Sequence, residues 1–258
     1  MSWLRRLVHG STWDGTSGTP RSANAASSFH LFWDAPEGSW TSAAVVVEVS
    51  TPPSVPSLYF WALQVSFVER GRAAGGAHLG LQWYPPHPGS TAVNWGGYAS
   101  NGHELNGSAS ILPSATGNPN TRDFAWSPAR AYRLAITRGR ARADGAVAWR
   151  GSITDVETGH EAVVRDLYAH GTHLETPIVW SEVFADCDAA AVEVRWRDLA
   201  LGDEEGDQLP VDTAVVSYQA VADGGCATTD SSVVGGAFVQ RTGTIRRVRP
   251  GARLTVEA

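Results

Sequence analysis

Residues 58–98 alternate between large apolar and smaller or polar side chains, and this alternation constrains the fold more than any other feature of the chain. In the segment Leu58–Val68 one parity carries Tyr59, Trp61, Leu63, Val65 and Phe67, and the other carries Phe60, Ala62, Gln64 and Ser66. Residues 77–84 and 90–98 repeat the pattern after the turn-forming stretches ERGRAAGG and PPHPG. A period of two is that of a β-strand. We therefore predict three strands with one apolar face and one face of amides and aromatic rings.

The same period recurs along most of the chain, and no stretch shows the period of an amphipathic helix. Further strands are predicted at 29–34, 40–50, 108–112, 131–138, 146–155, 160–168, 176–185, 190–201, 211–221, 234–240, 242–249 and 252–256. Many short strands with turn signals about every ten residues are typical of a sandwich. The predicted fold is all-β, a two-sheet antiparallel β-sandwich with jelly-roll connections.

Composition divides the chain into three parts. Residues 10–28 have small and polar side chains, so residues 1–28 are predicted to be a loop-like lead-in. Residues 29–205 are predicted to form the sandwich. The acidic stretch GDEEGDQLP marks a boundary, after which residues 206–258 form a β segment that either completes the sandwich or is appended to it.

Charge and apolar content exclude several classes of function. The net charge is −6 and all 20 basic side chains are Arg, so a general nucleic-acid binder and any catalytic lysine are excluded. No apolar run has the length of a signal peptide or a membrane span, so we expect no membrane partner and a cytoplasmic location by default, with export left open. The sequence leaves open whether Cys187 and Cys226 form a disulfide, because two cysteines in a chain of this length are too few to indicate a disulfide-stabilised fold.

Several segments carry a family resemblance: YFWALQVSF followed by HLGLQWY, the hairpin YRLAITR…WRGSITDVETG, and the late strand VEVRWRDLAL. Together they resemble the concanavalin A-like lectin/glucanase sandwich, in particular an uncharacterised bacterial group of that fold. The resemblance covers about residues 29–201. It implies two curved sheets and, in many members, a concave face that binds sugars.

A ligand site is predicted on the polar face of the central strands. Sugars present hydroxyl groups in one plane and a weakly apolar C–H face, so a sugar site combines amides or Arg with exposed aromatic rings. The candidate ligand-binding residues are Gln64, Gln82, Tyr84, Asn94, Trp95, Tyr98, Arg150 and Arg195. The alternative is that these amides make ordinary hydrogen bonds within the sandwich and that the Trp side chains belong to its core.

Catalysis is predicted less strongly than binding. Glycosidases with this sandwich place two carboxylates on one face of a strand, and the chain contains no sequence motif with closely spaced glutamates of that kind. The alternative catalytic candidates are Glu48, Glu182 and Glu193, which lie on separate predicted strands. A polysaccharide lyase is disfavoured because the chain has no lysine for the expected Tyr-x-Lys motif.

The candidates for metal binding are weak. His170 and His173 in a Gly/Thr loop lack the usual zinc spacing, and a plain surface loop accounts for them. Asp186 and Asp188 have the oxygen ligands of a structural calcium site, but a turn between strands explains the same residues. No other cofactor is expected.

The sequence thus favours a non-catalytic, lectin-like protein whose partner is a glycan. A glycoside hydrolase and a structural or protein-interaction sandwich are the alternatives. The oligomeric state cannot be read from the sequence.

Overall fold

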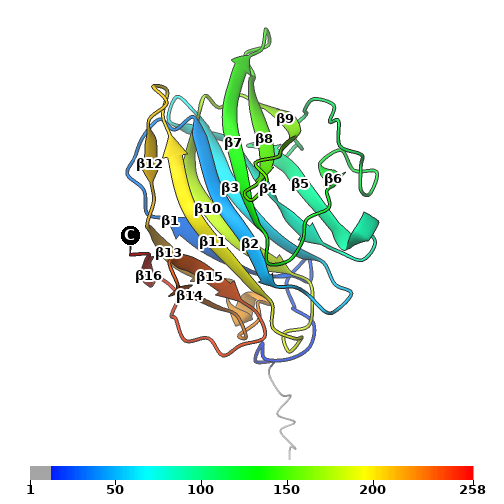
Figure 1. The fold of residues 1–258 in the computed structure, drawn as a ribbon. Coiled ribbons are helices and arrows are strands. Elements are labelled where there is room, and N and C mark those ends of the chain that lie inside the picture. Colours follow the sequence, from blue (N-terminus) through cyan, green and yellow to red (C-terminus); the bar gives the residue numbers. More distant parts are fainter. Residues whose placement is uncertain (1–12, 258) are drawn as a thin grey trace, which may run out of the picture.

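The computed structural model describes residues 13–257 and shows two antiparallel β-sheets packed face to face (Figure 1). The only helical pieces in this part of the chain are two single 3-10 turns, Pro88–Ser90 and Val221–Asp223. The predicted all-β, two-sheet sandwich is confirmed. No helix among the described residues has the length and apolar character needed to cross a membrane.

Sheet A has the strand order β16-β13-β1-β10-β3-β4-β5-β6. Its strands are β1 (Ser27–Trp33), β3 (Tyr59–Glu69), β4 (Arg72–Trp83), β5 (Thr91–Ala99), β6 (Thr121–Asp123), β10 (His173–Val183), β13 (Thr213–Tyr218) and β16 (Arg253–Thr255). The three strands predicted from residues 58–98 are therefore β3, β4 and β5, and they are neighbours in one sheet.

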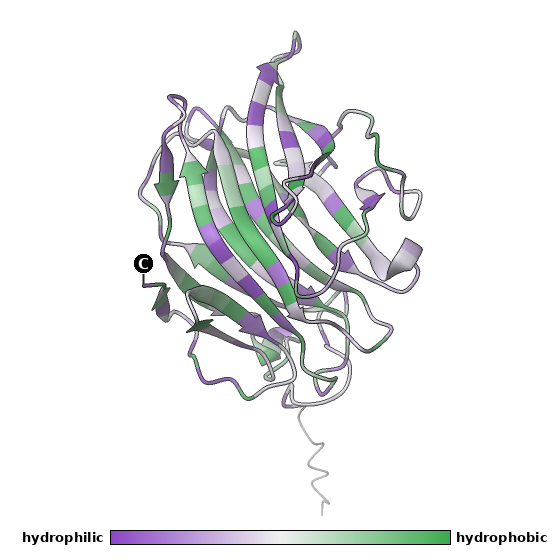
Figure 2. Cartoon of the chain, viewed as in Figure 1, coloured by the Kyte–Doolittle hydropathy of each residue, from purple (hydrophilic) through white to green (hydrophobic). Residues whose placement is uncertain are grey.

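Sheet B has the order β14-β15-β11-β2-β7-β8-β9, and β12 pairs with the end of β11. Its strands are β2 (Ser42–Thr51), β7 (Ala131–Ala141), β8 (Val147–Asp155), β9 (Glu161–Ala169), β11 (Glu193–Gly202), β12 (Gln208–Pro210), β14 (Asp230–Val234) and β15 (Ala237–Arg241). Alternating apolar and polar bands run along β2, β7 and β11 in Figure 2.

The core lies between the sheets, and its largest fully buried side chains are tryptophans: Trp61, Trp95, Trp149 and Trp196. Trp95 packs on Gly151 of the opposite sheet, where a Cβ would come within 2.7 Å of the ring. Its Nε1 donates to the carbonyl oxygen of Trp149 at 3.3 Å. Large rings thus meet small residues across the interface, so the sheets approach closely enough to exclude water.

The C-terminal segment supplies strands to both layers. β13 pairs with β1 in sheet A, and β15 pairs with β11 in sheet B. Residues 108–112 and 242–249, predicted as strands, contain none, whereas Asp230–Val234 is a strand where a loop was predicted. A side chain explains the absence of a strand at 242–249, because Asp230 Oδ1 accepts hydrogen bonds from the backbone N–H groups of Arg247 and Val248 and holds them in a loop.

Cys187 and Cys226 form a disulfide, which settles the question that the sequence left open. It joins the loop after β10 to the loop before β14, across a sequence separation of 39 residues. Near it, Cys226 N donates to Ser27 Oγ, at the start of β1. The bridge therefore ties the C-terminal segment to the body of the sandwich.

Replacing both cysteines by serine should lower the free energy of unfolding by about 4 kcal/mol, because the bridge closes a long loop in the unfolded chain. Denaturant titration of the oxidised wild type, the reduced wild type and the double variant measures this. Equal midpoints for all three would contradict the stabilising role.

Candidate functional site

The outer face of sheet A carries the candidate site, and its residues follow from the strand register. The even-numbered residues of β3 point away from the core, because Trp61, Leu63 and Val65 fill it. Residues paired in register on neighbouring strands form rows across this face. One row crosses the five strands β1, β10, β3, β4 and β5 and consists of His30, Trp180, Ala62, Gly80 and Asn94. The row on one side reads Ser28, Glu182, Phe60, Gln82 and Ala92, and the row on the other reads Phe32, Ile178, Gln64, His78 and Gly96.

An aromatic patch lies in the middle of this face. We define it as Phe60, Trp180 and His78 around Ala62, and its three rings contact one another with centroids 5.0 to 5.9 Å apart. Phe60, Ala62 and Trp180 form a buried apolar cluster separate from the main core, with exposures of 5%, 0% and 7%. The sandwich therefore has a second apolar centre, on the side of sheet A that faces away from sheet B.

Two histidines border the apolar rings, and burial disfavours the charged form of each. Burial lowers the pKa of His78 to about 4, and the neighbouring Asn94 amide opposes this shift. Burial also lowers the pKa of His30, whose ring lies 6.3 Å from that of Trp180. Taking an imidazole out of water disfavours its charged form, so burial favours the neutral form of both rings on this face.

Glu182 is a half-buried carboxyl group on this face, and its partners on the neighbouring strands are Ser28 and Phe60. Burial raises its pKa, while hydrogen bonds from Asn24 and Ser28 act in the opposite direction. Asn24 Nδ2 donates to Glu182 Oε1 at 3.0 Å. The oxygen of the same amide accepts from Ser22 Oγ at 2.9 Å, which fixes the amide with its N–H groups toward the carboxyl.

The three predicted amides do lie on the outer face, in different environments. Gln64 is half-buried between Ile178 and His78. Gln82 is buried, and its Oε1 lies 3.2 Å from the Nε2 of His87. Asn94 is buried and donates from Nδ2 to Thr121 Oγ1 at 2.9 Å. Gln82 is thus occupied within the protein, whereas Gln64 retains exposed surface.

The predicted aromatic residues are spread over different places. Tyr98 is 56% exposed near the end of β5, and Tyr84 follows β4 with its ring against His87. Trp95 has no exposed surface and lies in the core, so it cannot meet a ligand on this face. The strand was placed correctly, but Trp95 has the parity that points inward.

Arg150 and Arg195 lie on the other sheet. Arg150 is on β8 and pairs with Asp166 at 2.9 Å, and Arg195 is on β11 and pairs with Glu193 at 3.1 Å. Both strands belong to sheet B, so these guanidinium groups are separated from Gln64 and Asn94 by the thickness of the sandwich. They do not join the site.

Two of the three candidate catalytic carboxylates are neutralised by arginine. Glu48 pairs with Arg197 at 3.3 Å, and Glu193 pairs with both Arg195 and Arg241. Both lie on sheet B, while Glu182 lies on sheet A. These three glutamates therefore do not provide the facing pair of carboxylates that a glycosidase requires.

The predicted metal ligands have protein partners of their own. Asp186 Oδ1 accepts from Thr19 Oγ1, and Asp188 Oδ1 accepts from the backbone N–H of Gly18. His173 lies 3.7 Å from Glu175. Within residues 13–257, His, Cys, Asp and Glu side chains form no group of three or more that could hold a metal ion.

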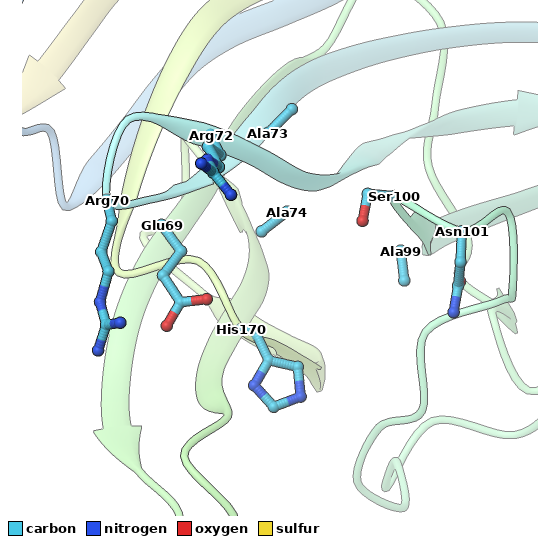
Figure 3. Close-up of a pocket in the computed structure, with 9 residues that line it drawn as sticks. All are labelled: Glu69, Arg70, Arg72, Ala73, Ala74, Ala99, Ser100, Asn101 and His170. Atoms are coloured by element: carbon cyan, nitrogen blue, oxygen red, sulfur yellow. The ribbon is translucent and has the colours of Figure 1, made fainter.

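A separate hollow of about 680 Å³ lies at the β3–β4 hairpin (Figure 3). Glu69 and His170 lie at its centre in Figure 3, and Arg70 and Arg72 flank the turn. Arg70, Arg72 and His170 are exposed, and none of them makes an ion pair within the described chain. Water satisfies such groups, so this hollow has no feature that marks it as the site.

Sequence reasoning missed the residues that give the outer face its character. Trp180, His30 and His78 lie on three different strands, and only the pairing order β1-β10-β3-β4 brings them together. The available signal was their parity: His78 shares the face of Gln82, and Trp180 shares that of Glu182. Asn24 lay in the predicted lead-in and carried no signal.

Comparisons with known proteins give likenesses of shape alone. No family model matches the chain, and no curated protein matches it. Scytalido-glutamic peptidase, solved with a peptide-based transition state analogue, has a TM-score of 0.43 at 10% identity, covering 88% of this chain and 99% of that one. SCP-B, of the eqolisin family of peptidases, solved with the tripeptide Ala-Ile-His, has a TM-score of 0.41 at 10% identity with the same coverage.

A third likeness is to tailspike protein 2 of Escherichia coli O157:H7 bacteriophage CAB120, with a TM-score of 0.32 at 14% identity, covering 75% of this chain and 22% of that one. Scores of this size do not decide the chemistry of the present protein. The contacts described above have to do so.

The expectation of a non-catalytic, lectin-like protein is wrong. The residues assembled for the sugar site fail to meet, because Trp95 is in the core and both arginines are on sheet B. What is confirmed is the coarser statement that the chain is a β-sandwich.

His78 should make the fold sensitive to acid. Its folded pKa of about 4 lies below the ordinary 6.5, so the unfolded chain binds a proton more readily. The stability contribution is complete above pH 6.5 and falls as pH drops to about 4, by up to about 3 kcal/mol. Denaturant titrations at several pH values should show this loss in the wild type and not in His78→Gln.

The exposed His160, in the turn between β8 and β9, provides the control, since His160→Gln should follow the wild-type curve. Parallel pH curves for the wild type and His78→Gln would contradict the buried, neutral imidazole.

Proposed function

We propose that the protein hydrolyses peptide bonds in mild acid, with Glu182 as the acid–base group and the outer face of sheet A as the substrate surface. The observation that carries this proposal is a half-buried carboxyl with a raised pKa, hydrogen-bonded to an oriented amide and set beside an apolar patch. A carboxyl group tuned upward by burial is a common form of general acid or base.

The proposed reaction needs one carboxyl group and one water molecule. The Glu182 carboxylate takes a proton from the water as the water oxygen attacks the carbonyl carbon of the peptide bond. The carboxyl then gives that proton to the amide nitrogen, and the C–N bond breaks to leave an acid and an amine. A raised pKa suits both steps, because the group must gain and lose a proton at the same pH.

Asn24 has a positioning role and an electrostatic role in this scheme. Ser22 holds the amide oxygen, so Nδ2 presents its hydrogens to the carboxyl side. One N–H orients Glu182, and the second is free to donate toward the oxyanion that develops on the substrate. A fixed neutral donor of this kind stabilises developing negative charge without reorganisation.

The chemistry of the face favours an extended, uncharged polypeptide segment as substrate. The row from His30 to Asn94 crosses four strand spacings, or about 19 Å, which is the length of about six extended residues. The rings of Phe60 and Trp180 suit apolar side chains, and burial disfavours the charged forms of His30 and His78 that would attract acidic ones. Glycoside hydrolysis is not supported, because the other two candidate carboxylates, Glu48 and Glu193, lie on sheet B.

Two broader assignments accompany this proposal. The two packed antiparallel sheets are consistent with membership of the concanavalin A-like superfamily, which stays a proposal for the fold. The disulfide favours an oxidising compartment over the cytoplasmic default, because cytosolic thiols are kept reduced.

Glu182→Gln should abolish hydrolysis while preserving the fold. The amide cannot move a proton, so we expect cleavage of casein, an unfolded polypeptide, to fall by about 100-fold or more. Release of new amino termini, followed from about pH 3 to pH 7, measures the rate. Because burial disfavours the ionised carboxylate, the variant should also gain stability over the wild type as pH rises through the raised pKa of Glu182.

Glu175→Gln is the matched control, since Glu175 is an exposed carboxylate on the same strand, β10. Full loss in Glu182→Gln with no loss in Glu175→Gln supports the assignment. Unchanged cleavage by Glu182→Gln, or a wild type without activity at every pH tested, overturns it.

A further inference from the structure

The amide that donates to Glu182 comes from residues 13–26, a segment that belongs to no strand or helix. We call it the Asn24 segment. Ala25, the residue after Asn24, has a φ of 58°, which is an unfavourable left-handed conformation for a residue with a Cβ atom. Such a conformation persists only where surrounding contacts hold it. The turn that presents Asn24 to Glu182 therefore depends on what holds the segment.

The loop after β10 holds the segment from one side. The carbonyl oxygen of Gly18 accepts from Cys187 N at 2.8 Å, and its backbone N–H donates to Asp188 Oδ1 at 2.9 Å. Thr19 Oγ1 donates to Asp186 Oδ1 at 2.7 Å. Each of these hydrogen bonds joins the Asn24 segment to Cys187 or to a residue directly beside it.

The loop before β14 holds the segment from the other side. Ala227 N donates to the carbonyl oxygen of Gly15 at 2.7 Å, and Arg21 N donates to that of Gly224 at 2.9 Å. Gly15 lies so close to this loop that a Cβ would come within 2.9 Å of Ala227 N. Cys226 lies between the two contact residues of this loop, directly before Ala227.

The disulfide joins these two loops, because one contains Cys187 and the other Cys226. The segment between them is therefore held by loops whose separation the bridge fixes. Cys226 N also donates to Ser27 Oγ at 2.8 Å, and the next residue, Ser28, is the register partner of Glu182. The bridge thus acts close to both partners of the hydrogen bond from Asn24 to Glu182.

Resting on the function proposed above, we propose that the Cys187–Cys226 disulfide is a positioning element of the site, which holds the Asn24 segment so that Asn24 donates to Glu182. Without the bridge, the two loops are no longer tied to each other, and the turn at Ala25 can relax to an ordinary backbone conformation. The hydrogen bond to Glu182 therefore requires the disulfide. This role is separate from general stabilisation, because it concerns one particular contact.

The effect of Asn24→Ala on the pKa of Glu182 tests this positioning. NMR titration of the side-chain carboxyl carbons of glutamate measures the pKa, and the signal of Glu182 is the one absent from Glu182→Gln. The hydrogen bond from Asn24 favours the carboxylate, so Asn24→Ala should raise the pKa in the disulfide-bonded protein. In the Cys187→Ser/Cys226→Ser variant, the same substitution should leave the pKa unchanged. An equal rise in both backgrounds overturns the inference.

Leu134→Ala is the control for lost stability. Leu134 is buried on β7 of sheet B, and removing a buried leucine side chain destabilises a protein about as much as removing a disulfide. Asn24→Ala should still raise the pKa of Glu182 in this background. If the effect of Asn24→Ala disappears in Leu134→Ala as well, it depends on stability alone and the inference fails. Thermal unfolding of each variant shows that it is folded.

Asp186→Ala/Asp188→Ala loosens the segment with the disulfide intact, because it removes the acceptors for Thr19 and Gly18. The effect of Asn24→Ala on the pKa of Glu182 should be lost in this variant too. If the cysteine variant does not fold, this variant decides the question, and an undiminished effect contradicts the proposal.

Casein cleavage separates this inference from the proposed function. If the wild type does not cleave casein but the effect of Asn24→Ala requires the disulfide, the positioning stands and the hydrolytic function fails. If Glu182→Gln abolishes cleavage while Asn24→Ala acts equally with and without the disulfide, the function stands and the positioning fails.

Discussion

Four tryptophans buried between the two sheets, Trp61, Trp95, Trp149 and Trp196, are the constraint on which the rest of the structure depends. Each ring fixes the parity of its strand, because turning a strand over would expose that ring and place a polar neighbour in the core. Trp95 over Gly151 also fixes how closely the sheets approach. Once the odd-numbered residues of β3 and β4 face inward, the even-numbered ones must form the outer face.

This constraint explains how much of the fold could be read from the sequence. The alternation in residues 58–98 places Trp61 inside and Gln64 outside, and the structure has both there. Strand ends set by side-chain contacts were not readable, as the hydrogen bonds of Asp230 to residues 247 and 248 illustrate. A carboxylate that ties two distant segments leaves no periodic pattern in the sequence.

The candidate site could be predicted only in part, because the sequence indicates which strands form hairpins and does not indicate which distant strands pair. Gln64, Gln82 and Asn94 share the outer face, because β3, β4 and β5 are consecutive hairpin strands and their register follows from the chain. Trp180 and Glu182 come from β10, which inserts between β1 and β3. That insertion cannot be read from local pattern. For the same reason the sequence could not show that Arg150 and Arg195 belong to the opposite sheet.

Environment separates the three glutamates that looked alike in sequence. Glu48 and Glu193 face arginines on sheet B, and ion pairs of this kind are ordinary features of a protein surface. Glu182 has no arginine partner, and it lies between Ser28 and the Phe60 ring. Burial without a countercharge raises the pKa of a carboxyl group, whereas pairing lowers it. The reactivity proposed for Glu182 therefore depends on the absence of an arginine partner, which leaves the pKa of the carboxyl group raised by burial.

The central claim is that this outer face is where an extended polypeptide lies, and hydroxyl-radical footprinting tests it directly. Phe32, 37% exposed on the outer face of β1, reports on the surface, while Val156 and Ile245, exposed elsewhere on the chain, serve as references. Adding casein to the Glu182→Gln variant should slow oxidation of Phe32 and leave the two references unchanged. Protection of the references with no change at Phe32 would contradict the account.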